Sequence, residues 1–387
     1  MIFTKEIMLT EHQNKILKGV LEAIKTNKYV VLNGSAGTGK TTVMKEFIKQ
    51  LKKTGQRYTL NATTHEAARQ LESKVNEQVG TIHKLHGLVP RYKRDAKSTY
   101  LIRSKGNSSI PKTRAIHIID EASMIGTELL SFIQEDTKGK YLFIGDDKQL
   151  PPVEDNNQDC VSPIFQMGFP TFTLEEIHRQ AKENDNIKLS MNLDLLNSGE
   201  DGEYYEWILN QEIFNIIEQY DATYLAFRNI HVDRINKEYR EYLGITDPYV
   251  TGEEVILQAP IAGYTNGERV KIFSIKEETY KKFGLNINCW LINYKIRIPK
   301  DYYGQKQVTD KLKSFAGIKD WNNFYPLKDD FTTVKHSYAM TIHKSQGSTF
   351  DNTILNVSDA MNCRNVKLRN KLLYTGVTRT QNKNFLI

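Results

Sequence analysis

The chain has 387 residues, a length that corresponds to two or three domains at about 150 residues each. Hydrophobic residues make up 39% of it and charged residues 26%, which is enough apolar material for packed cores and excludes a disordered tail protein. The 53 Lys and Arg outnumber the 46 Asp and Glu, so the net charge is a modest +7.

The cysteines and the apolar segments indicate a cellular compartment. Cys160, Cys289 and Cys363 are far apart and form no CxxC pair, which argues against a disulfide scaffold or zinc module and predicts a reducing environment. The chain shows neither a signal-peptide pattern nor an apolar run of membrane-spanning length. We therefore expect a soluble cytoplasmic protein with no membrane contact.

The basic residues are concentrated in particular segments. Residues 89–114 contain eight Lys or Arg and one acid, and residues 362–383 contain six bases and no acid. Residues 189–227 reverse this bias, with eight acids and no Lys or Arg. Such separation favours a polyanionic partner that contacts some segments and avoids others. A basic hairpin without any partner is the alternative.

The hydrophobic pattern, taken along the chain, predicts an α/β fold. Helical periodicity over 11–25 places Ile16, Leu17, Val20, Leu21 and Ile24 on one face. Such helical segments alternate with short apolar runs at 29–32, 116–119, 141–144, 224–227 and 353–357. This alternation is typical of parallel sheets covered by helices. Residues 251–334 differ, because short β-like runs broken by Gly, Asn and Pro predict an inserted small β-barrel.

The most specific motif is GSAGTGKT, which fits GxxxxGK[ST]. It follows the apolar run YVVLN and precedes a helix predicted over 41–53, the context that a phosphate-binding P-loop requires. Lys40 is expected to reach the β- and γ-phosphates, and the Thr41 hydroxyl to bind Mg²⁺. The predicted nucleotide-binding loop comprises Gly34, Ser35, Ala36, Gly37, Thr38, Gly39, Lys40, Thr41 and Thr42.

A P-loop needs acidic residues at the same sheet edge, and two later apolar runs end in them. Asp120 and Glu121 end AIHIIDE, where Asp120 suits Mg²⁺ binding and Glu121 suits activation of the attacking water. In GDDKQLPPV, Asp146 and Gln149 are expected beside the γ-phosphate. Arg179 and Arg379 are candidates for the positive charge that phosphoryl transfer requires, although a surface position is commoner for a single Arg.

Six ordered motifs together resemble the superfamily 1 DNA helicases, in the 5′→3′ branch of phage Dda and RecD-like enzymes. They are GSAGTGKTT, IIDEAS, GDDKQLPPV, LEEIHRQ, TIHKSQGSTF and LLYTGVTR, and the resemblance spans nearly the whole chain. It implies that Gln13 contacts adenine, that Gln149 senses phosphate, and that Arg179 and Arg379 approach the γ-phosphate. It also implies that Gly347 couples ATP to DNA. Thr10 and Gln13 equally fit a helix-capping box.

The resemblance further implies residues that contact the DNA strand. They are Thr64, His65, Thr81 and His83 in the first domain, and Phe227, Asn229, Asn236, Thr341, His343 and Lys344 in the second. Residues 63–66 also fit a helix cap, and a lone His is more often structural. Stacking on a base is expected of Tyr100 in the basic hairpin, which would act as a wedge at the fork. The alternative is that Tyr100 packs the hairpin onto its own domain.

The resemblance implies two RecA-like domains, 1–170 and 171–250 plus 335–387. The first carries a hairpin insertion at 88–113 and the second an SH3-like barrel at 251–334. The function it implies is an ATP- and Mg²⁺-dependent DNA helicase that moves 5′→3′ on single-stranded DNA and unwinds forks. The expected form is a phage-type monomer with replication proteins as candidate partners. Alternatives are a DNA-stimulated translocase that does not unwind, and a passive single-strand-binding protein.

Overall fold

The computed structural model describes residues 9–92, 99–103, 114–152, 161–176, 185–193, 196, 205–264 and 266–387. Its contacts divide the chain into two compact units. Unit 1 comprises Met1–Pro90, Leu101–Arg228 and Thr341–Ile387, and unit 2 comprises Arg91–Tyr100 and Asn229–Met340. No helix in the described ranges is both long enough and apolar enough to cross a membrane.

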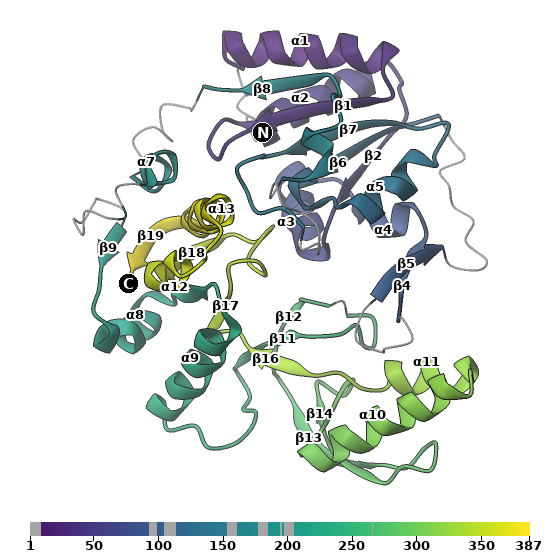
Figure 1. Ribbon diagram of the computed structural model, residues 1–387, viewed down its shortest axis with the longest axis vertical. Coiled ribbons are helices and arrows are strands. Elements are labelled where there is room, and N and C mark those ends of the chain that lie inside the picture. The colour runs from purple at the N-terminus through teal and green to yellow at the C-terminus, as the bar shows by residue number, and fades with distance from the viewer. Residues whose placement is uncertain are drawn as a thin grey trace, which may run out of the picture. The chain divides into compact units, whose positions relative to one another are not determined.

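The first sheet of unit 1 has six parallel strands in the order β3-β2-β6-β7-β1-β8 (Figure 1). The three predicted runs at 29–32, 116–119 and 141–144 are confirmed as β1, β6 and β7. The strands are β1 (Tyr29–Gly34), β2 (Tyr58–Ala62), β3 (Val79–Thr81), β6 (Ile116–Asp120), β7 (Lys140–Gly145) and β8 (Thr171–Leu174). Because β8 pairs with β1, the first α/β domain extends beyond the predicted boundary at residue 170.

Helices cover both faces of this sheet. Strand β1 shows why, since Val30 and Leu32 pack into one core and Val31 into the other, as alternation along a strand requires. The first face holds α1 (Glu11–Thr26), α2 (Lys40–Lys53) and α3 (His65–Val75). The second face holds α4 (Ile82–Leu85), η1 (Ala122–Met124), α5 (Thr127–Gln134) and η2 (Pro163–Phe165). The helices predicted at 11–25 and 41–53 are therefore confirmed.

The second sheet has the order β17-β10-β18-β19-β9, and β10, β18, β19 and β9 pair in parallel. Its strands are β9 (Tyr205–Trp207), β10 (Thr223–Ala226), β17 (Ala339–Thr341), β18 (Phe350–Leu355) and β19 (Thr380–Leu386). The helices of this part are α7 (Asp185–Met191), η4 (Asn210–Glu212), α8 (Ile213–Tyr220), α12 (Val357–Met361) and α13 (Val366–Val377). Parallel pairing here agrees with the predicted α/β fold, and we refer to this sheet and its helices as the second α/β domain.

The Asn229–Met340 segment of unit 2 begins with α9 (Asn229–Tyr242) and contains two three-stranded antiparallel sheets. One has the order β12-β11-β16 and the other β13-β14-β15. The strands are β11 (Glu254–Leu257), β12 (Arg269–Lys271), β13 (Ile275–Tyr280), β14 (Ile287–Ile292), β15 (Ile296–Pro299) and β16 (Val334–His336). Within the β-like region predicted at 251–334, residues 269–275 thus contribute to two strands, and residues 289–298 span a hairpin.

The expectation of a purely β insertion at 251–334 is wrong for part of that range. Residues 302–317 form α10 (Tyr302–Gly317), and α11 (Trp321–Asp329) follows it (Figure 1). Val308 and Phe315 of α10 and Leu327 of α11 pack into one core with strands β13 and β14. The spacing of Val308 and Phe315 by seven residues is helical, a signal that the many polar residues between them obscure.

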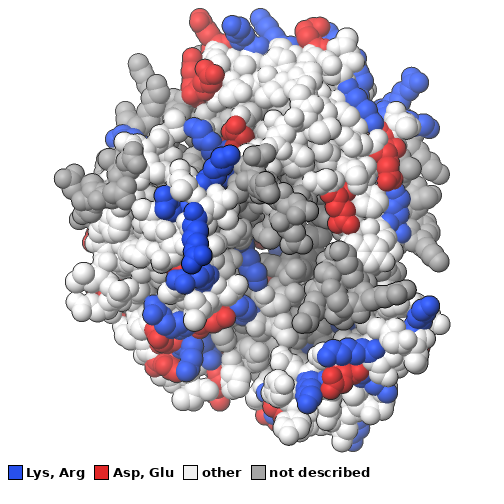
Figure 2. Space-filling model, viewed as in Figure 1, with Lys and Arg blue, Asp and Glu red and all other residues white. Residues whose placement is uncertain are grey.

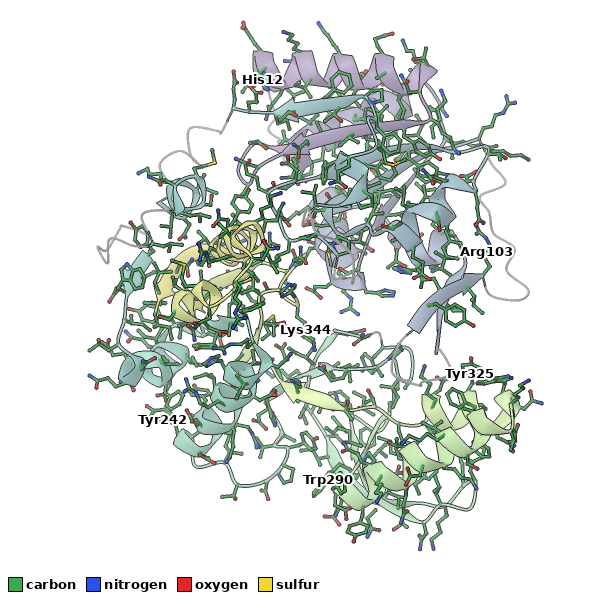
Figure 3. All side chains as sticks on the ribbon, viewed as in Figure 1. His12, Arg103, Tyr242, Trp290, Tyr325 and Lys344 are labelled. Atoms are coloured by element: carbon green, nitrogen blue, oxygen red, sulfur yellow. The ribbon has the colours of Figure 1, made fainter. Side chains whose placement is uncertain are left out.

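The basic segment contains two paired strands, β4 (Leu88–Tyr92) and β5 (Thr99–Arg103). The rest of the predicted 88–113 insertion lies outside the described residues. Arg103 in β5 donates to Glu135 at 2.7 Å and to the His86 carbonyl at 2.9 Å (Figure 3). Because Glu135 caps the end of α5, these bonds attach the C-terminal strand of the hairpin to the first α/β domain.

Candidate nucleotide and DNA sites

The P-loop connects β1 to α2 at the carboxyl edge of the first sheet. Gly37 and Gly39 have φ values of 78° and 83°, a left-handed conformation that favours glycine. Gly39 is the N-cap of α2, and no side chain caps the helix. Backbone N–H groups at such an uncapped helix start, together with the helix dipole, suit phosphate binding.

Lys40 is held inside the loop. Its ammonium group donates to the Gly34 carbonyl at 2.5 Å and to the Ser35 carbonyl at 3.0 Å. Thr38 closes the same turn, because its hydroxyl donates to the Ser35 carbonyl at 2.8 Å. The cation is therefore positioned over the P-loop backbone, where a phosphate would meet it.

Asp120 and Glu121 follow β6 at the same sheet edge. Burial, and secondly the negative charge of Glu121, raise the pKa of Asp120 to about 6, while Lys40 opposes this shift. Glu121 directly follows the last residue of β6. Its φ of 54° is uncommon for a residue with a side chain. Two adjacent half-buried carboxylates offer the oxygen ligands that a divalent cation prefers, so these residues fit Mg²⁺ bound with a nucleotide.

Buried polar atoms without partners occur in three of the predicted nucleotide motifs. Among the described residues, the Ser123 hydroxyl, the Gln149 carbonyl oxygen and Arg379 Nε have no hydrogen-bond partner. Arg379 is only 6% exposed, and its Nη1 donates to the Ser348 carbonyl at 3.2 Å. Orphaned donors and acceptors of this kind are costly in a packed core, so they mark these motifs as candidates for ligand contact.

Tyr374, on α13 of the second α/β domain, contacts the P-loop of the first. Its hydroxyl accepts from the Ala36 N–H at 3.0 Å and donates to Asp146 Oδ2 at 2.6 Å. Burial first, and then the Asp146 charge, raise the pKa of Tyr374, so its hydroxyl remains protonated and donates. This tyrosine lies within the LLYTGVTR motif, whose local pattern predicts no role for it.

A loop at 342–349, between β17 and β18, contacts both predicted sites of the first domain. Gln346 donates to the Leu150 carbonyl at 2.7 Å, directly after the Asp146–Gln149 motif. A Cβ added to Gly347 would lie 3.0 Å from Ala67 Cβ and 3.4 Å from Thr64 Oγ1. We call residues 342–349 the coupling loop. Gly347, which was expected to couple ATP to DNA, lies against α3, because its bare backbone and φ of 73° permit close approach there, and its contact with nucleotide stays a prediction.

Gln13 makes both halves of the capping box that the sequence allowed. Its backbone N–H donates to Thr10 Oγ1 at 3.2 Å, and its side-chain oxygen accepts from the Thr10 N–H at 3.1 Å. The side-chain nitrogen donates to the Thr38 carbonyl at 3.2 Å, so Gln13 also contacts the P-loop. The structure thus supports the helix-capping interpretation, and contact with adenine stays a prediction. Arg179 lies outside the described residues.

The first-domain DNA candidates lie at the carboxyl edge of neighbouring strands β2 and β3. Thr64 is the N-cap of α3 and Thr81 the N-cap of α4, and each hydroxyl accepts a backbone N–H, at 3.1 and 3.2 Å. His65 is exposed, whereas His83 is half-buried, and burial lowers its pKa. Ala62 at the end of β2 pairs with Thr81 at the end of β3. The N-terminal ends of α3 and α4 therefore follow neighbouring strand ends.

The second-domain candidates separate into exposed and buried residues. Lys344 is exposed (Figure 3) and His343 lies 6.1 Å from the Phe227 ring between ring centroids. Asn229 is exposed on α9, where its side-chain oxygen accepts from Lys335. Thr341 is 6% exposed and accepts the Lys344 N–H, so its hydroxyl acts as a cap.

Asn236 was predicted to contact DNA, and its environment contradicts this. The side chain is only 6% exposed. Its amide donates to the Ala339 carbonyl at 3.1 Å and accepts from the Ala339 N–H at 3.0 Å. Both polar ends are therefore used to attach β17 to α9, which is a structural role. Asp359, which belongs to none of the sequence motifs, accepts from the Phe227 and Arg228 N–H groups and fixes that segment.

A parallel sheet with a P-loop at its carboxyl edge, and a second α/β domain that contacts this loop, define a P-loop nucleoside triphosphatase of RecA-like type. The AAA domain family matches residues 8–218, and the UvrD-like helicase C-terminal domain family matches residues 336–387. The chain belongs to the AAA domain family and to the superfamily 1 helicases of the Pif1, Dda and RecD group.

Relatives and solved structures of this group match most of the chain. The ATP-dependent DNA helicase dda of Enterobacteria phage T4 is 27% identical, with 96% of this chain and 97% of that protein covered. The ATP-dependent DNA helicase Pif1 of Bdellovibrio bacteriovorus is 26% identical over 86% of this chain and 79% of its own length. The crystal structure of Bacteroides Pif1 with ADP-AlF3 and single-stranded DNA has a TM-score of 0.56 at 18% identity, covering 98% of this chain and 92% of that one.

Proposed function

We propose that this protein is an ATP-dependent DNA helicase that moves 5′→3′ along single-stranded DNA and unwinds forked duplexes. The coupling loop is the observation that carries the proposal. Gln346 bonds the backbone after the Gln149 motif, and Gly347, one residue later, packs against the N-cap of α3. A single short loop thus joins the residues assigned to nucleotide with those assigned to the DNA strand.

In the proposed nucleotide site, the P-loop amides and Lys40 hold the phosphates, and Thr41 and Asp120 hold Mg²⁺. Bound Mg²⁺-ATP supplies the phosphoanhydride bond and the metal charge that polarises it. Glu121 accepts the proton of the attacking water, Gln149 orients that water, and Arg379 neutralises charge on the leaving phosphate oxygens. Arg379 adjoins α13, the helix that carries Tyr374, so the two act from one rigid element.

In the proposed DNA site, the helix starts at Thr64 and Thr81 grip phosphates through backbone N–H groups, and His65, His83, His343 and Lys344 add side-chain contacts. Phosphate contacts are independent of sequence and sensitive to salt, as a motor requires. Two domains that alternate their grip convert nucleotide-driven movement into steps. We place this activity in the cytoplasm, with a monomer as the working unit and replication proteins as candidate partners.

The proposal is tested with forked duplexes that carry either a 5′ or a 3′ single-stranded tail. ATPase activity is measured with and without oligothymidylate, and strand separation is followed under single-turnover conditions. We expect DNA-stimulated hydrolysis and unwinding of the 5′-tailed fork. The Lys40→Ala variant should lose both activities, whereas Lys49→Ala, an exposed lysine of the same helix, should keep them.

Three results would contradict the proposal in different ways. Unwinding of only the 3′-tailed fork would reverse the polarity. Stimulated hydrolysis without strand separation would identify a translocase. Binding of single-stranded DNA without hydrolysis would leave a passive binding protein.

A further inference from the structure

Two aromatic rings of unit 2 stand together on its surface. Phe273, between β12 and β13, is 66% exposed, and Tyr294, at the turn between β14 and β15, is 58% exposed. Their ring centroids lie 6.4 Å apart. Single exposed aromatic residues are common, but two such rings presented side by side by separate loops require an explanation.

A buried asparagine holds these loops together. Asn293 is 3% exposed, and its side-chain oxygen accepts from the Phe273 and Ser274 N–H groups at 2.9 and 3.2 Å. Its side-chain nitrogen donates to the Lys271 carbonyl at 2.9 Å. The position of the Phe273 backbone is therefore fixed relative to the Tyr294 turn, so the pair is preorganised.

The turn itself is built at a conformational cost. Asn293 and Tyr294 both have positive φ, at 52° and 61°, as in a two-residue hairpin turn that favours Asn followed by Gly. Tyr occupies the position where Gly is preferred, although its side chain makes the left-handed conformation unfavourable. A strained residue with an exposed ring is a reason to look for a function of that ring.

The surroundings of the two rings carry unneutralised positive charge. The Lys276 ammonium lies 4.7 Å from the Tyr294 ring centroid. Lys271, Lys276 and Lys295 are exposed, and none of them has a carboxylate partner among the described residues. The acids of β13 are already paired, Glu277 with Lys300 at 2.5 Å and Glu278 with Arg297.

The charge around the two rings differs from that of the α10 and α11 part of unit 2. Figure 2 shows basic and acidic side chains intermixed over the α10 and α11 part, where Lys313 pairs with Asp310. Aromatic faces combined with unpaired lysines match a ligand that has flat apolar rings on a polyanionic chain.

We propose that Phe273 and Tyr294 form a base-stacking site for single-stranded DNA, with Lys271, Lys276 and Lys295 contacting its phosphates. The inference rests on the proposed helicase function, because that function supplies the single strand. It adds a DNA contact on unit 2 that does not depend on nucleotide. Stacking on aromatic side chains accepts any base, so the site would be independent of sequence.

The test is equilibrium binding of fluorescein-labelled oligothymidylate without nucleotide, followed by anisotropy. The variants are Tyr294→Gly, Phe273→Ala and the two combined. We expect the double variant to bind about five- to tenfold more weakly, which corresponds to the loss of stacking on about one base. An abasic oligonucleotide of equal length should bind the wild type and the double variant alike. Unchanged affinity for oligothymidylate, or equal loss for the abasic strand, would overturn the site.

Two controls separate this site from misfolding and from general exposure. Glycine suits the left-handed turn, so Tyr294→Gly should melt at or above the wild-type temperature. Tyr303→Ala removes a ring that is 75% exposed on the mixed-charge α10 surface and should not change affinity. If the wild type shows no DNA-stimulated ATPase, the proposed function itself fails. If it unwinds forks normally and the double variant binds as the wild type does, only the stacking site fails.

Discussion

The Tyr374 hydroxyl donates a hydrogen bond of 2.6 Å to Asp146. This bond connects α13 to the loop that begins directly after β7. The same oxygen accepts the Ala36 N–H of the P-loop. Thr375 adds a parallel contact, because its hydroxyl accepts the Leu150 N–H at 3.2 Å. Two neighbouring residues of α13 therefore bond to the P-loop and to the Asp146 loop together.

Replacing Tyr374 by Phe should lower DNA-stimulated turnover by about tenfold or more, because the helix that precedes Arg379 loses its bond to the P-loop. The Km for ATP should change much less. The unfolding free energy should fall by about 1–3 kcal/mol, since Asp146 loses a buried donor. Steady-state ATPase and chemical denaturation measure these effects.

The control is Tyr224→Phe, at a buried tyrosine whose hydroxyl accepts from Asn356 at 2.7 Å in the same domain. It should lose stability and keep turnover. If both variants lose turnover in proportion to stability, Tyr374 has no special position in coupling.

Gly347→Ala should uncouple hydrolysis from DNA. The new Cβ would meet Ala67 Cβ at 3.0 Å, and the φ of 73° adds strain of about 1–2 kcal/mol. We expect basal ATPase to survive while stimulation by oligothymidylate and unwinding fall. Gly244→Ala is the matched control, because its φ is 70° and no atom lies within 4 Å. An equal loss of stimulation in both variants would show that backbone strain alone is responsible.

Glu121→Gln should keep nucleotide binding and slow hydrolysis by about 10²–10⁴, because the amide cannot accept the proton of the attacking water. Single-turnover hydrolysis and binding of a fluorescent ATP analogue measure the two effects. Asp147→Asn changes an exposed carboxylate near the same edge and should have little effect. Weakened ATP binding with normal turnover at saturation would make Glu121 a metal ligand instead.

Arg379→Ala should reduce turnover by about 10³, as loss of an arginine that stabilises phosphoryl transfer does. Binding of single-stranded DNA without nucleotide should be nearly normal. Because Arg379 is buried, Arg379→Lys serves as a second variant that retains the charge and should recover part of the activity if the fold is intact. DNA affinity that falls as much as turnover would place Arg379 at the DNA.

Tyr100→Ala tests the wedge. The Tyr100 side chain is 40% exposed, which leaves ring surface for a base pair. Strand separation should slow while ATPase stimulated by single-stranded DNA stays normal. Tyr242→Ala, at an exposed tyrosine of α9, should leave both rates unchanged (Figure 3). A drop of several degrees in melting temperature, with all activities reduced together, would indicate that Tyr100 packs the hairpin.

Much of the nucleotide site was predictable from local sequence. A P-loop can be recognised from sequence because residues 34–41 must adopt one backbone path between a strand and a helix, and that path requires glycine at fixed positions. Asp120 was predictable because a carboxylate at the end of an apolar strand in a parallel sheet lies at the carboxyl edge, where the P-loop also lies. The capping residues Thr10, Thr64 and Thr81 follow from short-range hydrogen bonding alone.

The sequence by itself determined the fold class, the P-loop and the family, because each depends on local patterns of glycine, charge and hydrophobic spacing. Only the tertiary structure decided which residues contact across long separations. It placed Gly347 against Thr64 and Ala67, bonded Tyr374 to Asp146, and used both ends of the Asn236 amide to hold β17. It also joined Phe273 to the Tyr294 turn through Asn293. Hydrogen bonds between residues far apart in the chain leave no periodic signal, because the partner is set by how sheets and loops pack.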